Sequence, residues 1–294
     1  MTAETKLEGL VFDLPDEAYH GEKGHYSSTQ FKDALKDIEY FHDKYVTGEI
    51  VEEVSSSTQN NFDIGHAYHC LTLEPHKFDE GFAVFSGAVK RGKAYDTFKE
   101  ENEGKKILSQ KQYNTAKFIA DAADKNQVSS DLRSEGLAEV SLFVELHGVK
   151  VKVRADWISF TGEFNEGIPY IMDMKSTTGN PKDKKKVVKK IEDMGYELSA
   201  ALYLDAFNEY LGKKGEPLIE QFKWSFESKD LGTSKVYTAT EQMIEVGRKK
   251  YMEGLKKIKA AKAAGWVFTD TDDFIEPSSF AKIDWLEDKE EDLL

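Results

Sequence analysis

The stretch Pro169-Tyr170-Ile171-Met172-Asp173-Met174-Lys175-Ser176-Thr177-Thr178 decides how the rest of the chain is interpreted. It predicts a short buried strand that ends in polar residues. Ile171, Asp173 and Lys175 are spaced two apart, so they share one face of a strand. A carboxylate and an ammonium on an apolar strand need a partner or a metal, because an unpaired buried charge is costly. The stretch is therefore either an ion pair at a solvated sheet edge or part of a reactive site.

The composition limits the classes of protein to consider. The 294 residues include 54 Asp and Glu against 40 Lys and Arg, and the formal net charge is −14. This argues against a basic coat protein of nucleic acid, but a nuclease can concentrate basic residues in one groove. The single cysteine, Cys70, excludes a disulfide or a four-cysteine metal site within one chain. With no signal pattern and no apolar run near ~20 residues, we expect a soluble cytoplasmic protein without a membrane partner.

An antiparallel hairpin is predicted just before the opening stretch. Residues 138–146 and 149–159 alternate between apolar and polar, and His147-Gly148 between them predicts a tight turn. With the opening stretch this gives three consecutive antiparallel strands. One face of the middle strand carries polar residues, namely Lys152, Arg154 and Asp156. The opposite face carries Val151, Val153 and Ala155.

Helices are predicted on both sides of these strands. The first opens at Ser27 or Ser28 and continues with helical spacing through Phe31, Leu35, Ile38 and Phe41. Its serines are either plain caps or part of an anion pocket for a DNA phosphate. A polar loop is expected over residues 47–61, followed by a helix that carries His69 and stops near Pro75. Further helices are expected over 109–124, 198–207 and 240–264, with another strand over 222–227.

A basic run follows the opening stretch. It contains Lys182, Lys184, Lys185 and Lys186 in an otherwise acidic chain. A run of like charges is usually a solvated loop and helix start. Its place beside the predicted site makes contact with the phosphate backbone an equal alternative.

The polar residues of the neighbouring strands form a set with a chemical meaning. Asp156 and Asp173, with Lys175 two residues further on, are the parts of a metal-dependent phosphodiesterase. Mg²⁺ is held by hard oxygen ligands and keeps several waters, so two carboxylates and a backbone carbonyl suffice. The metal lowers the pKa of a bound water, and a nearby lysine can orient or deprotonate that water.

The sequence from about Tyr26 to Trp285 resembles the PD-(D/E)XK nuclease superfamily, and within it the RecE-type exonucleases (exonuclease VIII) of phage recombination systems. The motifs that carry the resemblance are Tyr26-Ser27-Ser28-Thr29, Gly65-His66-Ala67-Tyr68-His69-Cys70-Leu71 with Leu73-Glu74-Pro75, Glu139-Val140-Ser141, Arg154-Ala155-Asp156-Trp157, Asp173-Met174-Lys175-Ser176-Thr177, and Gly195-Tyr196 with Ala200-Ala201-Leu202-Tyr203.

The resemblance implies a role for each matching residue. The metal ligands would be His69, Asp156, Asp173 and the backbone carbonyl of Met174. The catalytic group would comprise Lys175, Asp173, Asp156 and, with a less defined role, Glu139. Contacts to DNA would come from Ser27, Ser28, Arg154, Tyr196, Ser199, Tyr203 and the four lysines of the basic run. Ser199 is a departure, because the family has glutamine in this helix motif.

We therefore expect a single α/β domain of the PD-(D/E)XK (restriction-endonuclease-like) fold, a mixed sheet whose antiparallel core hairpin is flanked by helices. A helical portion to about residue 130 would precede a catalytic core over about 131–285. The resemblance implies a Mg²⁺-dependent exonuclease, for which Mn²⁺ is a substitute, acting 5′ to 3′ on the ends of double-stranded DNA.

A RecT-like annealing protein and a homo-oligomeric ring, trimeric or tetrameric, would be its partners. An endonuclease, a 3′ to 5′ nuclease, and a silent DNA-binding protein on the same fold remain alternatives. The acidic tail over 287–292 is either a docking element or a solubilising end.

Overall fold

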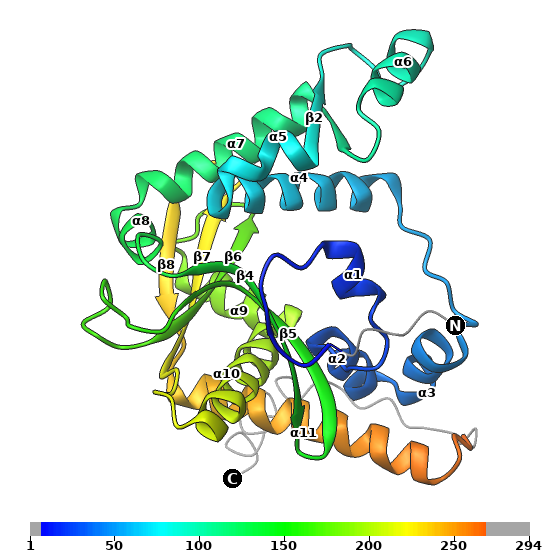
Figure 1. The fold of residues 1–294 in the computed structure, drawn as a ribbon, viewed down its shortest axis with the longest axis vertical. Coiled ribbons are helices and arrows are strands. Elements are labelled where there is room, and N and C mark those ends of the chain that lie inside the picture. Colours follow the sequence, from blue (N-terminus) through cyan, green and yellow to red (C-terminus); the bar gives the residue numbers. More distant parts are fainter. Residues whose placement is uncertain (1–6, 269–294) are drawn as a thin grey trace, which may run out of the picture.

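The computed structural model describes residues 7–268, and its centre is a six-stranded mixed sheet (Figure 1). The strands lie in the order β1-β4-β5-β6-β7-β8. Their bounds are Gly9–Val11, Leu137–Leu146, Val149–Ser159, Tyr170–Thr177, Gln221–Ser228 and Ser234–Thr238. All neighbouring pairs are antiparallel except β6 and β7. The predicted mixed sheet with an antiparallel core hairpin is confirmed.

The β4–β5 hairpin forms where the sequence predicted it. Its turn residues His147 and Gly148 both have positive φ, 51° and 75°. Two such residues are required by the tight turn whose twist matches a hairpin. Leu146 pairs with Val149 across the turn, and this register carries through the ladder to Leu137 and Ile158.

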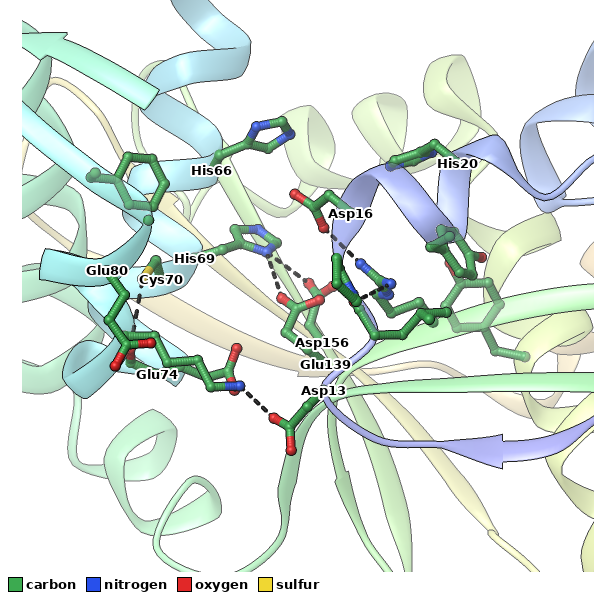
Figure 2. A pocket seen from close by; sticks show the side chains of 18 residues that line it. Asp13, Asp16, His20, His66, His69, Cys70, Glu74, Glu80, Glu139 and Asp156 are labelled. Carbon is green, nitrogen blue, oxygen red and sulfur yellow. Dashed lines mark hydrogen bonds and ion pairs between the residues drawn. The ribbon is translucent and has the colours of Figure 1, made fainter. Parts of the chain in front are cut away.

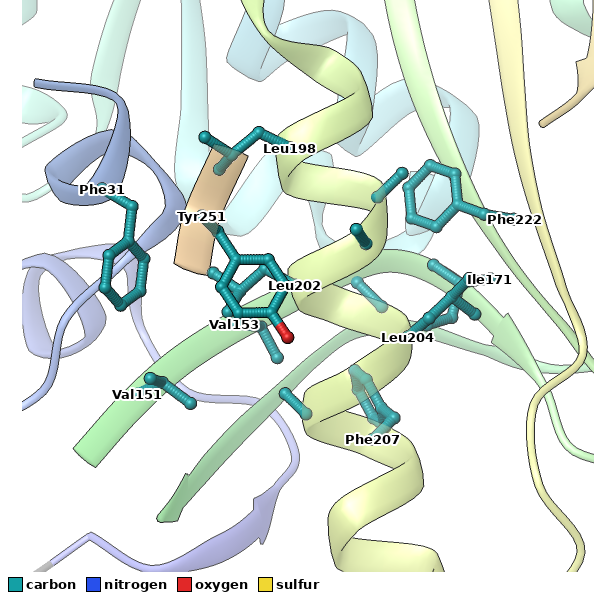
Figure 3. Packing of buried hydrophobic residues seen from close by; sticks show 14 of the residues in the cluster. Phe31, Val151, Val153, Ile171, Leu198, Leu202, Leu204, Phe207, Phe222 and Tyr251 are labelled. Carbon is teal, nitrogen blue, oxygen red and sulfur yellow. The ribbon is translucent and has the colours of Figure 1, made fainter. Parts of the chain in front are cut away.

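One helical layer covers the sheet face to which Val151 and Val153 point (Figure 3). Helices α9 (Lys184–Met194) and α10 (Tyr196–Lys214) form the crossover that a parallel β6–β7 pair needs. Helix α10 packs centrally on the sheet with its apolar side chains, including Leu202 and Phe207. Helices α11 (Glu241–Ala263) and α2 (Ser28–Lys36) complete this layer.

The opposite face is covered by α4 (Ser56–Leu73) and α7 (Gln110–Lys125), which lie side by side (Figure 1). Their buried side chains pack on Tyr170, Met172 and Met174 of β6. Shorter elements surround these layers: α1 (Asp16–Gly21), α3 (Ile38–His42), a π-helical turn (Asp43–Thr47), a 3₁₀ turn (Pro75–Lys77), α5 (Phe78–Gly81), β2 (Phe82–Phe85), α6 (Lys93–Glu101), β3 (Lys106–Ser109) and α8 (Gln127–Leu132).

Two predicted boundaries were wrong. The helix expected to run through Phe41 ends at Lys36, because the Asp37 side chain accepts hydrogen bonds from Glu39 and Tyr40 N–H, each 2.9 Å, and so starts the separate helix α3. Helix α4 begins inside the predicted polar loop, where Ser55 accepts from the Thr58 N–H at 3.2 Å. Local capping by small polar side chains decided both boundaries.

The division of the domain near residue 130 stays a prediction, and the acidic tail lies outside the described residues. Within residues 7–268, no helix is both long enough and apolar enough to cross a membrane.

Close backbone contact between α10 and α11 gives a test of the packing. A Cβ placed on Gly247 of α11 would lie 1.9 Å from the Glu197 carbonyl oxygen at the start of α10. We expect Gly247→Ala to lower the free energy of unfolding by about 1–3 kcal/mol, because the two helices must separate. Urea denaturation measures the change.

The matched control is Gly65→Ala, since Gly65 lies inside helix α4 and its added Cβ would meet nothing within 4 Å. This variant should be more stable than the parent by about 0.5–1 kcal/mol. Equal stability of the two variants would contradict the packing described for α11.

Candidate active site

The site forms at the point along β4 and β5 where alternate side chains switch from one helical layer to the other. Val153 and Ala155 belong to the cluster under α10, whereas Trp157 belongs to the cluster under α4. At the same level of β4, Glu139 has a φ of 51°, which is unusual for a residue other than glycine. Ala138–Trp157 and Val140–Ala155 are paired on either side, so Glu139 and Asp156 lie opposite each other. The strained backbone at Glu139 thus coincides with two adjacent carboxylates, as is common at functional sites.

Three side chains from three elements meet at this point (Figure 2). His69 comes from α4, Glu139 from β4 and Asp156 from β5. The His69 Nδ1 lies 3.7 Å from Glu139 Oε1 and 3.8 Å from Asp156 Oδ2. One ligand atom from each residue lies within 4.8 Å of the others. We call these three residues the acidic trio.

The backbone of Met174 completes this arrangement. Strands β5 and β6 are paired only as far as Trp157 and Met172, so Met174 lies beyond the paired part of the ladder. Its N–H donates to Asp156 Oδ2 at 2.7 Å, and its carbonyl oxygen lies 3.2 Å from His69 Nε2. The predicted carbonyl ligand is therefore placed beside the trio.

Asp173 and Lys175 lie beside the trio as an ion pair. Lys175 Nζ is 2.7 Å from Asp173 Oδ2, and it also lies over the ring of Tyr196 at 5.3 Å from the centroid. The sequence predicted Asp173 as a metal ligand. In the structure its carboxylate is bonded to Lys175, and Glu139 is the second carboxylate of the trio.

Burial and neighbouring charges shift the pKa values of these groups. Burial alone would lower the pKa of His69, but Asp156 and Glu139 outweigh it and raise this pKa to about 9. Burial raises the pKa of Asp173 to about 6, where Lys175 opposes the change and Asp156 adds to it. Burial acts to lower the pKa of Lys175, yet Asp173 and Asp156 hold it well above its ordinary value. Excess negative charge therefore dominates the site, as expected for a site that binds a cation.

The donor set fits a divalent metal ion. Two carboxylates and a backbone carbonyl are the hard oxygen ligands that Mg²⁺ and Mn²⁺ take, and an imidazole is a common further ligand of transition metals. His69, Glu139, Asp156 and the Met174 carbonyl are the groups that would hold the ion. Three of these four were predicted as metal ligands, whereas Glu139 was predicted as a member of the catalytic group with a less defined role.

The trio lies in a cleft of about 680 Å³ between α4 and the segment around α1 (Figure 2). Arg154 lines this cleft, but its guanidinium is already engaged. It bonds Asp16 Oδ1 at 2.7 Å, the Leu14 carbonyl at 2.9 Å and Ser141 Oγ at 2.9 Å, and it stacks on the Tyr19 ring. Arg154 therefore fastens the N-terminal segment across one wall of the cleft.

The other predicted contact residues are spread over several places in the fold. Tyr203 lines the cleft, and Tyr196 lies beneath Lys175. Ser199 is buried in α10, while Ser27 and Ser28 form the start of α2. The basic run is exposed at and before the start of α9, and among the described residues its lysines are not part of the cleft lining. Its residues are Lys182, Lys184, Lys185 and Lys186.

A buried carboxylate that the sequence did not indicate, Glu227, holds α4 on the sheet. Glu227 of β7 accepts hydrogen bonds from the hydroxyls of Tyr68, Ser225 and Ser234, the last at 3.0 Å. Burial raises the pKa of Glu227, although these three donors oppose the change. The only sequence signal was a glutamate at the end of an apolar strand. Because Tyr68 precedes His69, this contact helps to set the position of the trio's imidazole.

We expect Tyr68→Phe to lower the free energy of unfolding by about 1–3 kcal/mol, because it removes one donor from the buried Glu227 carboxylate. It should also weaken Mn²⁺ binding measured by calorimetry. Tyr113→Phe on α7 is the control, since no hydrogen bond of the Tyr113 hydroxyl is found within residues 7–268. An unchanged stability and metal affinity of Tyr68→Phe would show that the contact does not support His69.

The fold has relatives among solved structures. A crystal structure from Eubacterium rectale, described as a "Putative exonuclease", superposes with a TM-score of 0.57 and 17% identity, over 93% of this chain and 99% of its own. A second structure, SSO0001, has 11% identity over 76% of this chain and 84% of its own, and its TM-score of 0.26 supports no conclusion. The comparison with curated proteins gave no match.

A family profile described as a PDDEXK-like domain of unknown function (DUF3799) matches residues 27–266. This range contains the acidic trio, the Asp173–Lys175 pair and both helical layers. The chain belongs to this PDDEXK-like family.

Proposed function

We propose that this chain is a divalent-metal-dependent deoxyribonuclease. The observation that carries the proposal is the convergence of His69, Glu139 and Asp156 next to the Asp173–Lys175 pair. Acidic and imidazole ligands beside a lysine are the groups that hydrolysis of a phosphodiester needs. A cation held there would act as a Lewis acid on the phosphate and would lower the pKa of a bound water.

Lys175 contributes a fixed positive charge. Because its pKa is held well above the ordinary value by Asp173 and Asp156, its ammonium keeps its proton at neutral pH. It can donate hydrogen bonds to a phosphate oxygen or orient a water. The Tyr196 ring and Asp173 fix the ammonium from two sides. Preorganised charge of this kind stabilises the negative charge that develops in the transition state.

The finer activity that we propose is 5′ to 3′ digestion of linear duplex DNA with Mg²⁺, for which Mn²⁺ can substitute. The oligomeric ring, the single-strand annealing partner, the role in recombination and the cytoplasmic location belong to the same proposal. These features are supported by the motif resemblance to RecE-type exonucleases. Endonuclease action and 3′ to 5′ action use the same groups, so the position of a label on the substrate separates them.

We expect Lys175→Met and Asp156→Asn each to lower Mg²⁺-dependent hydrolysis of a duplex by about 10²–10³-fold, because the first removes a positive charge at the reacting phosphate and the second removes a ligand of the cation. The substrate carries a label at one 5′ end, and release of short labelled products is followed by gel. A chelator should stop the reaction in the parent, and added Mg²⁺ or Mn²⁺ should restore it.

Lys189→Met is the control for loss of a lysine, because Lys189 is exposed on α9 and pairs with Asp193. Its hydrolysis rate should equal that of the parent. Undiminished hydrolysis by a folded Lys175→Met protein would refute the assignment. Cleavage of a covalently closed circle would favour the endonuclease alternative.

The Arg154–Asp16 contact gives a second test. If Arg154 binds the DNA backbone, Asp16 competes with the phosphate for the same guanidinium. Asp16→Asn should then strengthen DNA binding by about two- to fivefold, because an ion pair with one exposed partner is worth about 0.2–1 kcal/mol. Fluorescence anisotropy with a labelled duplex measures the affinity.

Glu17→Gln removes the same charge from the same short helix, and Glu17 has no contact with Arg154 among the described residues. It therefore reports the general effect of one negative charge less. If Asp16→Asn and Glu17→Gln change the affinity equally, Arg154 only holds the N-terminal segment.

A further inference from the structure

Four half-buried lysines from four elements surround the reactive end of β6. They are Lys32 of α2, Lys175 of β6, Lys190 of α9 and Lys229 of the turn after β7, and we call them the lysine row. The ammonium groups of Lys32 and Lys175 both lie on the Tyr196 ring, at 5.7 and 5.3 Å from its centroid. Mutual repulsion also links Lys175 with Lys190 and Lys190 with Lys229. Lys175 therefore has Lys32 and Lys190 as cationic neighbours.

Some half-buried lysines elsewhere in the fold pair with carboxylates, whereas within residues 7–268 Lys32 and Lys190 of this row do not. Lys44 and Lys77 each make two ion pairs with carboxylates. By contrast, Lys32 and Lys190 make no ion pair with any residue in the described part of the chain. Lys190 donates to the Ser176 carbonyl, at 2.9 Å, and the Lys32 ammonium lies over the Tyr196 ring.

Burial and neighbouring positive charge disfavour the charged form of Lys32 and Lys190, so an anion bound beside them would stabilise it. Burial and the charge of Lys175 lower the pKa of Lys32 to about 8, although the charges of Asp173 and Glu197 oppose the change. Burial, Lys229 and Lys175 do the same to Lys190. An ammonium that has lost part of its hydration and is repelled by its neighbours is stabilised when an anion binds between them.

The position of Lys190 also separates it from the predicted basic run on the same helix. Lys184, Lys185 and Lys186 are exposed in the first turn of α9, where solvent already stabilises them. Lys190 lies on the inner side of α9, because its ammonium reaches the backbone of β6 one residue after Lys175. The residue closest to the reacting groups is therefore outside the run that the sequence highlighted.

We propose that Lys32 and Lys190 bind the two DNA backbone phosphates next to the phosphate held at Lys175. This inference rests on the proposed function for the identity of the ligand. The inference differs from the proposed function because it concerns DNA binding alone, which needs neither a metal ion nor hydrolysis. A DNA strand that contacts Lys32, Lys175 and Lys190 would neutralise these three ammonium groups of the row. The acidic trio then faces only the central phosphate.

The test uses the full chain and a short fluorescent DNA duplex in a chelating buffer, with anisotropy recorded at several KCl concentrations. Lys32→Met and Lys190→Met keep the length of the side chain and remove its charge. Each should weaken binding about tenfold near 0.1 M salt, and each should reduce the slope of log affinity against log salt by about one. Lys32→Arg and Lys190→Arg should restore both quantities, which a purely structural role for the lysines would not require.

Lys36→Met and Lys189→Met are the controls, since these lysines are exposed on the same two helices. They should leave the salt slope unchanged. An unchanged slope in folded Lys32→Met and Lys190→Met proteins would overturn the proposal, and so would a parent protein that does not bind DNA. If the variants lose affinity as expected but the parent hydrolyses no DNA with Mg²⁺ or Mn²⁺, the lysine row stands and the proposed nuclease activity fails.

Discussion

The hydrogen bond from the Met174 N–H to the Asp156 carboxylate is the interaction on which the site depends. In a strand, the N–H and the carbonyl of one residue point to the same side, where a neighbouring strand would normally pair with them. Strand β5 stops pairing with β6 at Met172, which leaves this side of Met174 without its ladder partner. Asp156 takes the N–H, and His69 approaches the carbonyl. Where β5 and β6 diverge, the Met174 N–H and carbonyl lose their ladder partners. Asp156 and His69 take the place of these partners, so the buried backbone groups remain hydrogen-bonded.

Charge is arranged around this point in two opposing groups. The acidic trio gathers negative charge strongly enough to raise the pKa of His69 against the effect of burial. Around Lys175, burial and the positive charge gathered by the lysine row lower the pKa of Lys32 and Lys190. Each group would be stabilised by a ligand of the opposite charge, a cation for the trio and an anion for the row. Within an acidic chain, this local contrast is a more specific indication of a phosphodiester substrate than the net charge of −14.

The parts of the fold that could be predicted from the sequence are those that local patterns determine. Alternation and the His147-Gly148 turn specified the hairpin, and Ser109 specified the start of α7. The misplaced boundaries, at Asp37 and Ser55, arose where polar side chains cap helices inside stretches that resembled a continuous helix or a loop. What the sequence could not specify are contacts between distant segments. Arg154 with Asp16 is one such contact, and Tyr68 with Glu227 is another, because neither residue type nor spacing indicates the partner.

Helix α4, which is mainly polar, contacts both charged groups. In its second turn, Asn61 lies 3.5 Å from the ammonium of Lys229, at one end of the lysine row. Two turns further on, Tyr68 is held by Glu227 and His69 reaches the trio. Both contacts from Tyr68 and Asn61 go to β7 or the turn that follows it, so a shift of α4 along the sheet would move the imidazole and disturb the row together. One rigid element therefore carries the imidazole of the trio and contacts Lys229 at the end of the lysine row.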